Sequence, residues 1–134
     1  QVVLFNETIP IVKTAKYLGL VINSKFNWKD HVKTVINKAQ TACHRLQILL
    51  QNPKMELRLK RLLYISMIRP ILTYASPAWC NISTSLLKKL KICQNKILRK
   101  ITKARWFIRN KNIHSYLNID FFRSSHCKAK LQIF

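Results

Sequence analysis

The chain has 134 residues, of which 49% are hydrophobic, so it can form one compact domain with its own core. It carries 25 lysines and arginines against four scattered acids, and its formal net charge is +21. Four isolated acids argue against metal-assisted phosphoryl transfer, which needs carboxylates converging on a metal. The charge instead predicts an anionic partner, with nucleic acid the first candidate and an anionic membrane surface the second.

Residues 1–26 have a β-like pattern in the stretches QVVLF, IPIV and KYLGLVI, with turn residues at Asn6-Glu7 and Asn23-Ser24. The opening stretch has no initiating Met, so we expect a segment of a longer polypeptide. Gly19 is the single glycine of the chain. It predicts either a tight turn or a close approach of the backbone to another group, and a β-bulge with a packing role is the alternative.

A helical pattern begins at Asn27, which we expect to be the N-cap, with Asp30 as a weak capping-box acid. Asn52-Pro53 is expected to end this helix. Its apolar face comprises Trp28, Val32, Val35, Ile36, Ala39, Cys43, Leu46 and Leu50. Its polar face comprises Lys29, Lys33, Lys38, His44 and Arg45.

A second helix is predicted from about Lys54 through Ile68, bent or interrupted at Pro70. Residues 62–79 approach the length of a membrane span, but they include Arg69 and two prolines. We therefore expect a buried, kinked helix here and no membrane span.

A third helix follows over residues 85–103, with Ser83 or Ser85 as its cap. One side gathers Leu86, Leu87, Leu90, Cys93, Ile97, Leu98 and Ile101. The other side carries seven cations, namely Lys88, Lys89, Lys91, Lys96, Arg99, Lys100 and Lys103, with Ile92 out of place. A merely solvated face would include glutamates for i,i+4 pairs, and this face has none, so it is typical of a polyanion-binding surface.

Basic and aromatic residues are interleaved over residues 104–119, where Arg105, Arg109 and Lys111 alternate with aromatic rings. The rings are those of Trp106, Phe107 and Tyr116. Such a pattern can hold phosphates while a ring stacks on a base, or the rings can belong to the core. Residues 121–134 are expected to form a final amphipathic segment that packs on the bundle.

Cysteine and histidine positions favour buried, reduced thiols over a disulfide framework or a metal site. The cysteines are Cys43, Cys80, Cys93 and Cys127, and the sequence has no CxxC. Adjacent pairs, Cys43-His44 and His126-Cys127, rarely serve one tetrahedral zinc site, and neighbours in a helix point about 100° apart, which is wrong for a Cys-His nucleophile. We expect no metal, no cofactor and no catalytic residue in this chain.

Four stretches in register carry a family resemblance that extends over essentially the whole chain: KYLGLVINSKFNWKDHV, LLYISMIRPILTYASPAW, LLKKLKICQNKILRKIT and WFIRNKNIHSYLNI. Together they resemble the region downstream of the catalytic palm in reverse transcriptases of non-LTR retrotransposons, especially jockey-like elements. The resemblance implies that residues 1–26 are the end of the palm and residues 27–134 a thumb and connection-like region. The family's catalytic aspartates and the Mg²⁺ they hold belong to the parent polymerase, upstream of this chain.

The resemblance also implies a primer-grip-like site at Lys16, Tyr17, Leu18 and Gly19, and partners in a template-primer duplex such as an RNA–DNA hybrid and in the upstream palm and fingers. Relatives often carry glycine in the stretches where this chain has Ala75, Cys80 and Lys103, and Asp where it has Asn23, which puts the turn geometry there in question. The resemblance further implies an intracellular protein, in the nucleus or the cytoplasm or both, that is not secreted.

We therefore predict a mainly α fold, a helical bundle with a small N-terminal β-hairpin, as a non-catalytic part of a polymerase that holds nucleic acid. The alternatives are a stand-alone or decayed basic nucleic-acid-binding module, a cationic membrane-surface protein and a bundle that recruits an acidic protein. The predicted nucleic-acid-binding residues are Lys29, Lys33, Lys38, Arg45, Lys88, Lys89, Lys91, Lys96, Arg99, Lys100, Lys103, Arg105, Arg109 and Lys111.

Overall fold

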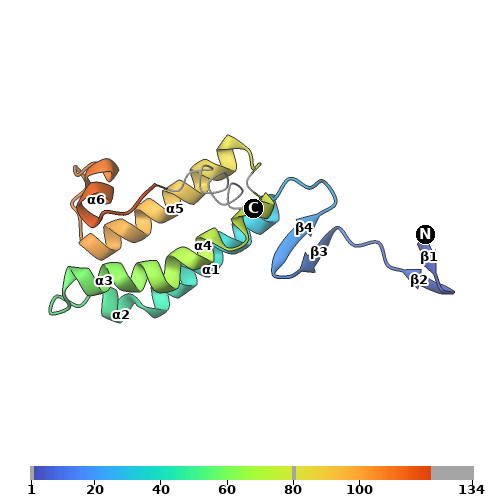
Figure 1. The fold of residues 1–134 in the computed structure, drawn as a ribbon, viewed down its shortest axis with the longest axis horizontal. Coiled ribbons are helices and arrows are strands. Elements are labelled where there is room, and N and C mark those ends of the chain that lie inside the picture. The colour runs from blue at the N-terminus through green and yellow to red at the C-terminus, as the bar shows by residue number, and fades with distance from the viewer. Residues whose placement is uncertain (1, 80, 122–134) are drawn as a thin grey trace, which may run out of the picture.

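Two β-hairpins precede a helical body in the computed structural model, which describes residues 2–79 and 81–121 (Figure 1). Strands β1 (Val2–Leu4) and β2 (Glu7–Ile9) pair antiparallel, and so do β3 (Thr14–Tyr17) and β4 (Leu20–Asn23). The first three strands are exposed, whereas β4 is half-buried and packs on the first helix. The predicted β element is confirmed, but it consists of two hairpins and not one.

The turns of these hairpins only partly follow the sequence prediction. The first turn lies at Phe5-Asn6, one residue before the predicted Asn6-Glu7. The stretch KYLGLVI is not one strand, because a two-residue turn at Leu18-Gly19 divides it into β3 and β4. The predicted turn after β4 is present, since the Phe26 N–H donates to the Asn23 carbonyl over 3.0 Å.

The helical body contains six α-helices, with one π-helical and one 3₁₀ segment, over the described residues. Their bounds are α1 (Lys29–Arg45), α2 (Gln47–Leu50), α3 (Leu57–Leu63), the π-helix η1 (Tyr64–Ile68), α4 (Arg69–Thr73), the 3₁₀-helix η2 (Ser76–Trp79), α5 (Thr84–Thr102) and α6 (Asn110–Leu117). The mainly α fold is thus confirmed. Residues 122–134, where an amphipathic segment was predicted, lie outside the described residues.

Helix α1 begins one residue later than predicted, with Trp28 in the left-handed region at its N-cap. Asn27 still contributes, because its Oδ1 accepts a 3.2 Å hydrogen bond from the Lys29 N–H. The capping-box role of Asp30 is wrong: its carboxylate accepts the side-chain amide of Asn23 at 3.0 Å. The helix also breaks at Leu46, so the predicted helix to residue 52 is divided into α1 and α2.

The predicted interruption at Pro70 takes the form of a π-helical segment. Proline has no N–H and its ring crowds the preceding turn, so a regular α-helix cannot pass through it unchanged. Here η1 lies immediately before the short helix α4, in which Pro70 occupies one of the first two positions. The wider turn of η1 lets the chain continue in nearly one direction from α3 to α4 (Figure 1).

The core lies where α1, the α3–α4 segment and α5 meet, with α6 covering the end of α5 (Figure 1). The apolar faces predicted for α1 and α5 are buried or half-buried throughout, and Ile92 is 44% exposed, as its place in the pattern predicted. The largest buried side chains are Trp79 and Tyr64. Burial of these faces leaves the opposite faces of the two long helices to solvent.

Candidate nucleic-acid interface

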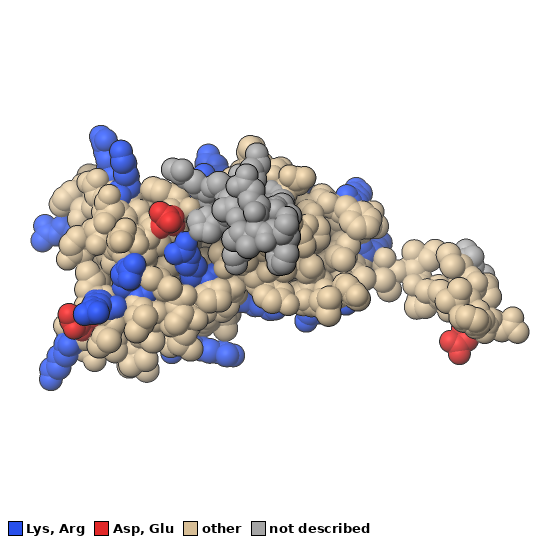
Figure 2. Space-filling model, in the orientation of Figure 1, with Lys and Arg blue, Asp and Glu red and all other residues tan. Residues whose placement is uncertain are grey.

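Most of the predicted basic residues lie on α1 and α5, and the others lie in the loop between α5 and α6 or on α6. All of them except Lys91 and Arg99, which are half-buried, are exposed. Figure 2 shows blue basic side chains around the helical body and few red acidic ones on the face in view. Since the chain has no acid between Glu56 and Asp120, the cations of α5 have no carboxylate on their own helix to neutralise them. The resulting positive field attracts polyanions.

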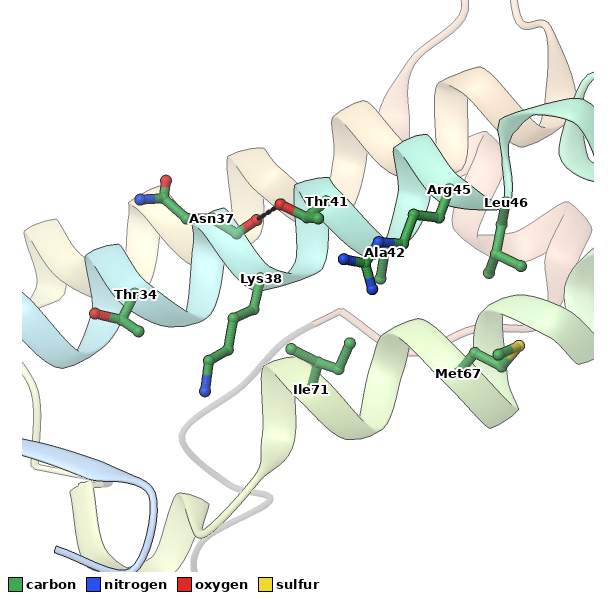
Figure 3. A pocket seen from close by; sticks show the side chains of 9 residues that line it. All are labelled: Thr34, Asn37, Lys38, Thr41, Ala42, Arg45, Leu46, Met67 and Ile71. Carbon is green, nitrogen blue, oxygen red and sulfur yellow. Dashed lines mark hydrogen bonds between the residues drawn. The ribbon is translucent and has the colours of Figure 1, made fainter. Parts of the chain in front are cut away.

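Lys38 and Arg45 both lie on the α1 wall of an open groove between α1 and the η1–α4 segment (Figure 3). The groove has a volume of about 590 Å³, and Met67 and Ile71 line its other wall. A second hollow of about 410 Å³, lined by Gly19 and Tyr74 among others, shares Thr34, Lys38 and Ile71 with the first. The two hollows therefore form one groove along α1, with an apolar floor and cations at its edge.

The predicted primer-grip-like residues lie at the tip of the β3–β4 hairpin. Leu18 and Gly19 have φ values of +47° and +79°, as the two-residue turn between twisted strands requires. A Cβ on Gly19 would lie 3.3 Å from Cε1 of Tyr74, whose hydroxyl donates a 3.0 Å hydrogen bond to the Leu18 carbonyl. Gly19 thus serves a tight turn and a close approach, here to Tyr74 of the same chain, and the β-bulge interpretation is wrong.

Arg99 has an internal role that the sequence did not predict. Its Nε donates to Oδ1 of Asn110 at 2.9 Å, its Nη1 donates to the Arg105 carbonyl at 3.2 Å, and its Nη2 donates to the Ile108 carbonyl. The guanidinium therefore ties the loop between α5 and α6 to the end of α5. These bonds occupy most of the donors that would otherwise meet a phosphate.

The loop held by Arg99 presents two aromatic rings to solvent. Trp106 is 89% exposed and Phe107 is 60% exposed, and their rings meet edge to face with centroids 5.9 Å apart. Tyr116, on α6, is 74% exposed. The interpretation of these rings as ordinary core is therefore wrong. They lie among Lys103, Arg105, Arg109 and Lys111, all of which are exposed.

Two buried histidines hold elements together, and the sequence analysis assigned neither of them a role. The Nδ1 of His31 accepts the Val21 N–H over 3.3 Å, which fixes β4 to α1, and its ring meets those of Trp28 and Trp79. Burial, and secondarily the charge of Lys38, lowers the pKa of His31. His114 lies 2.9 Å from the Ile119 carbonyl, and burial likewise lowers its pKa. The sequence signal that could have found these roles is the position of each histidine on the buried side of its helix.

Arg61 is a second internal tie that sequence reasoning missed. It donates to the carbonyls of Leu117 and Asn118, at 2.5 and 3.2 Å, where α6 ends. A cation there complements the negative end of the helix dipole. Lys60, on the same helix, is only 6% exposed. Neither residue belongs to the outward-facing basic surface.

The described thiols are buried and carry no sign of a reactive role. Cys43 and Cys93 are free cysteines, and burial raises the pKa of both. Cys80 and the His126-Cys127 pair lie outside the described residues. Within residues 2–79 and 81–121, no three His, Cys, Asp or Glu side chains gather closely enough to hold a metal ion, and no helix has the length and apolarity that crossing a bilayer requires.

Comparison with curated proteins finds transposon polymerases. The RNA-directed DNA polymerase from the mobile element jockey of Drosophila melanogaster is 30% identical over 105 residues, or 78% of this chain. The probable RNA-directed DNA polymerases from the transposons X-element and BS of the same species are 29% and 28% identical over 83% and 78% of this chain. The resemblance to these jockey-like polymerases is confirmed. The chain spans 12% of the length of each of them.

No protein-family model matches the chain, and no solved structure matches it.

Proposed function

From the similarity to a segment of jockey-like RNA-directed DNA polymerases, we propose that this chain is the part of such a polymerase that holds the template-primer duplex. In this proposal residues 1–26 end the palm, with Lys16, Tyr17, Leu18 and Gly19 as a primer-grip-like tip, and residues 27–134 are thumb and connection-like. The role places the protein inside the cell, in the nucleus or the cytoplasm, where its template is found.

The observation that carries the proposal is the arrangement of charge on α1 and α5. These two helices pack together through their apolar faces, and both point lysines and arginines outward. A duplex that changes sequence with each added nucleotide must be held by its phosphates and groove shape, not by its base edges. Lysine suits this task because its ammonium group is a compact charge without the bidentate geometry that fixes arginine to one site.

The groove along α1 supplies a place where these contacts could be concentrated. Lys38 and Arg45 lie at its edge, and the Gly19 tip lines its far end. In the proposed role the two cations meet backbone phosphates while the hairpin tip approaches the primer. Arg99 is not assigned a phosphate, because its donors serve the loop after α5.

Catalysis is assigned to the rest of the polymerase. Among the described residues, no three His, Cys, Asp or Glu side chains gather closely enough to hold the Mg²⁺ implied for the parent enzyme. We therefore assign no metal-dependent step to this chain. The upstream palm and fingers are its proposed protein partners. The exposed strands β1 to β3 and the turn between β1 and β2 offer apolar surface for that contact, with Val3, Phe5 and Tyr17 at 60%, 94% and 65% exposure.

The test is fluorescence anisotropy of the chain with a labelled RNA–DNA hybrid, single strands and anionic vesicles, each over roughly 50 to 200 mM salt. We expect the hybrid to bind best, with log K falling linearly as log salt rises. Lys89→Gln and Lys96→Gln should each reduce the slope by about one. Lys54→Gln, which removes an exposed charge outside the predicted set, is the matched control and should change the slope less.

Two outcomes would contradict the proposal. If vesicles compete equally with the hybrid, the cationic membrane-surface alternative gains support. If the control variant changes the slope as much as Lys89→Gln does, the charge acts as a diffuse attraction for any polyanion and the duplex has no defined contact surface on this chain.

A further inference from the structure

We infer that Trp106 is a stacking platform for an unpaired nucleobase, so that the loop between α5 and α6 binds single-stranded nucleic acid next to the duplex. The inference rests on the proposed function and adds a ligand that phosphate contacts alone do not define. Three features of the loop support it in successive steps: the exposure of the ring, the order of the loop and the charges around it.

Exposure of Trp106 is the first step. Along the loop Ala104 and Ile108 are half-buried and pack against the core, whereas the two residues between Arg105 and Ile108 point their rings outward. At 89% exposure Trp106 has nearly all of its ring surface in water. Its ring meets that of the exposed Phe107, and contiguous exposed apolar surface rimmed by polar residues is typical of a binding site. Indole offers both a flat face for stacking and the strongest cation–π partner among the side chains.

The second step is that the loop is held in place and not merely left out of the core. Arg99 donates to backbone carbonyls at positions 105 and 108, on either side of the two rings. The Ile108 N–H closes a turn on the Arg105 carbonyl at 3.1 Å. A ring carried on an ordered loop loses little conformational freedom when it binds, so more of the stacking energy appears as affinity.

Charge around the ring is the third step and selects the ligand. Lys103, Arg105, Arg109 and Lys111 are all exposed within five residues of Trp106 along the chain, and no acid occurs from residue 57 to residue 119. Cations that track a backbone beside an aromatic face are the common design of proteins that bind single strands. A loop that inserts into a membrane would expose more apolar residues than Trp106 and Phe107, but here the other exposed residues from position 103 to 111 are all cations.

Binding of two ligands that differ only in an unpaired stretch tests the inference. One is a blunt RNA–DNA hybrid, and the other is the same hybrid with a single-stranded template extension of about six nucleotides. We expect the extension to strengthen binding of the unaltered chain roughly tenfold, the effect of stacking one base. Trp106 should also report directly, because Trp28 is half-buried and Trp79 is 2% exposed, so stacking quenches mainly the fluorescence of Trp106.

Three variants separate stacking from other uses of the ring. Trp106→Leu keeps an apolar side chain but removes the aromatic face, and it should abolish the gain from the extension while leaving blunt-hybrid affinity within about twofold. Trp106→Phe should retain most of the gain and lose most of the fluorescence quenching. Phe26→Leu, which removes another exposed ring outside the candidate interface, is the matched control and should behave as the unaltered chain.

Failure of this inference is distinguishable from failure of the proposed function. If the blunt hybrid binds with the expected salt dependence but Trp106→Leu leaves the gain from the extension intact, the stacking platform is refuted and the duplex-holding role stands. If Trp106→Leu weakens vesicle binding and leaves the extended hybrid unaffected, the ring belongs to a membrane contact. If no hybrid binds at all, both proposals fall. Because Trp106 is so exposed, its variants should unfold at the same temperature as the unaltered chain, and this is measured alongside.

Discussion

Replacing Gly19 by alanine should destabilise the β3–β4 hairpin through two separate effects. With φ at +79°, Gly19 lies in a region that costs a residue with a Cβ about 1–2 kcal/mol. The added Cβ would also lie 3.3 Å from Cε1 of Tyr74, closer than most such contacts. Tyr74 is exposed enough to move, but moving it strains the 3.0 Å hydrogen bond to the Leu18 carbonyl, which is worth about 0.5–1.5 kcal/mol.

The total is on the order of 2 kcal/mol, which corresponds to a decrease in Tm of roughly 6–10 °C for a chain of this size. Urea unfolding measures the global free energy, and hydrogen exchange of the Val21 amide, which donates to His31, measures local undocking of the hairpin. Gly19→Asn is the informative companion variant, because asparagine tolerates left-handed backbone better but still carries the Cβ. It should recover about half of the loss.

A double-mutant cycle with Tyr74→Leu isolates the crowding. In that background the ring is gone, so Gly19→Ala should cost only the conformational part, about 1 kcal/mol. A free energy of unfolding for Gly19→Ala within about 0.5 kcal/mol of that of the unaltered chain would contradict this prediction, and so would an asparagine variant that is no more stable than the alanine variant.

Three further predictions concern the helical body. Lys103 has φ of +52° just after α5, so Lys103→Gly should raise the free energy of unfolding by about 0.5–1 kcal/mol and lower the salt slope of duplex binding. A lower free energy of unfolding in urea for this variant would contradict the prediction. Arg61→Met removes both donors to the carbonyls at the end of α6 and should cost about 1–3 kcal/mol, whereas Arg58→Met, exposed on the same helix, should be nearly neutral by the same assay. Burial lowers the pKa of His31 and His114, so the unfolded chain binds protons more readily and stability should fall as pH decreases below about 6.5. Unfolding midpoints that are flat between about pH 7 and pH 5 would refute this assignment.

Long periodic segments were predictable from the sequence, and contacts between distant segments were not. The two faces of α5 follow from a pattern of nearly twenty residues at 3.6 per turn, so their burial and exposure could be read directly. The roles of Arg99 and Arg61 depend on the path of the loop after α5 and on the position of α6 in the fold. Hydrophobic periodicity specifies neither of these. The sequence predicted an interruption of the helix near Pro70, but periodicity does not distinguish a π-helical segment from a kink or a break.

Two tryptophans show why residue type alone could not predict which aromatic rings are buried and which are exposed. Trp79 and Trp106 are the same residue type, yet Trp79 is 2% exposed and Trp106 is 89% exposed. Trp79 donates its indole N–H to the Tyr74 carbonyl at 2.9 Å, so burial leaves its polar atom satisfied. The sequence signal that separates them is the neighbourhood, since Trp106 lies among cations and Trp79 follows a proline-containing apolar stretch.

Two turns of this chain have a non-glycine residue in the left-handed backbone region, which affects the stability of the chain. The resemblance implied glycine in the stretches that contain Ala75 and Lys103, and both of these residues have positive φ, +49° and +52°. Both residues therefore adopt a left-handed backbone conformation, which glycine would favour. At Ala75 the buried Trp79 indole fixes the adjacent Tyr74 carbonyl, and at Lys103 the following N–H of Ala104 bonds the Arg99 carbonyl at 3.3 Å. Packing thus imposes the turns, and each costs about 1 kcal/mol that glycine would not. Introducing glycine at both positions should therefore raise stability additively, because different hydrogen bonds form the two turns.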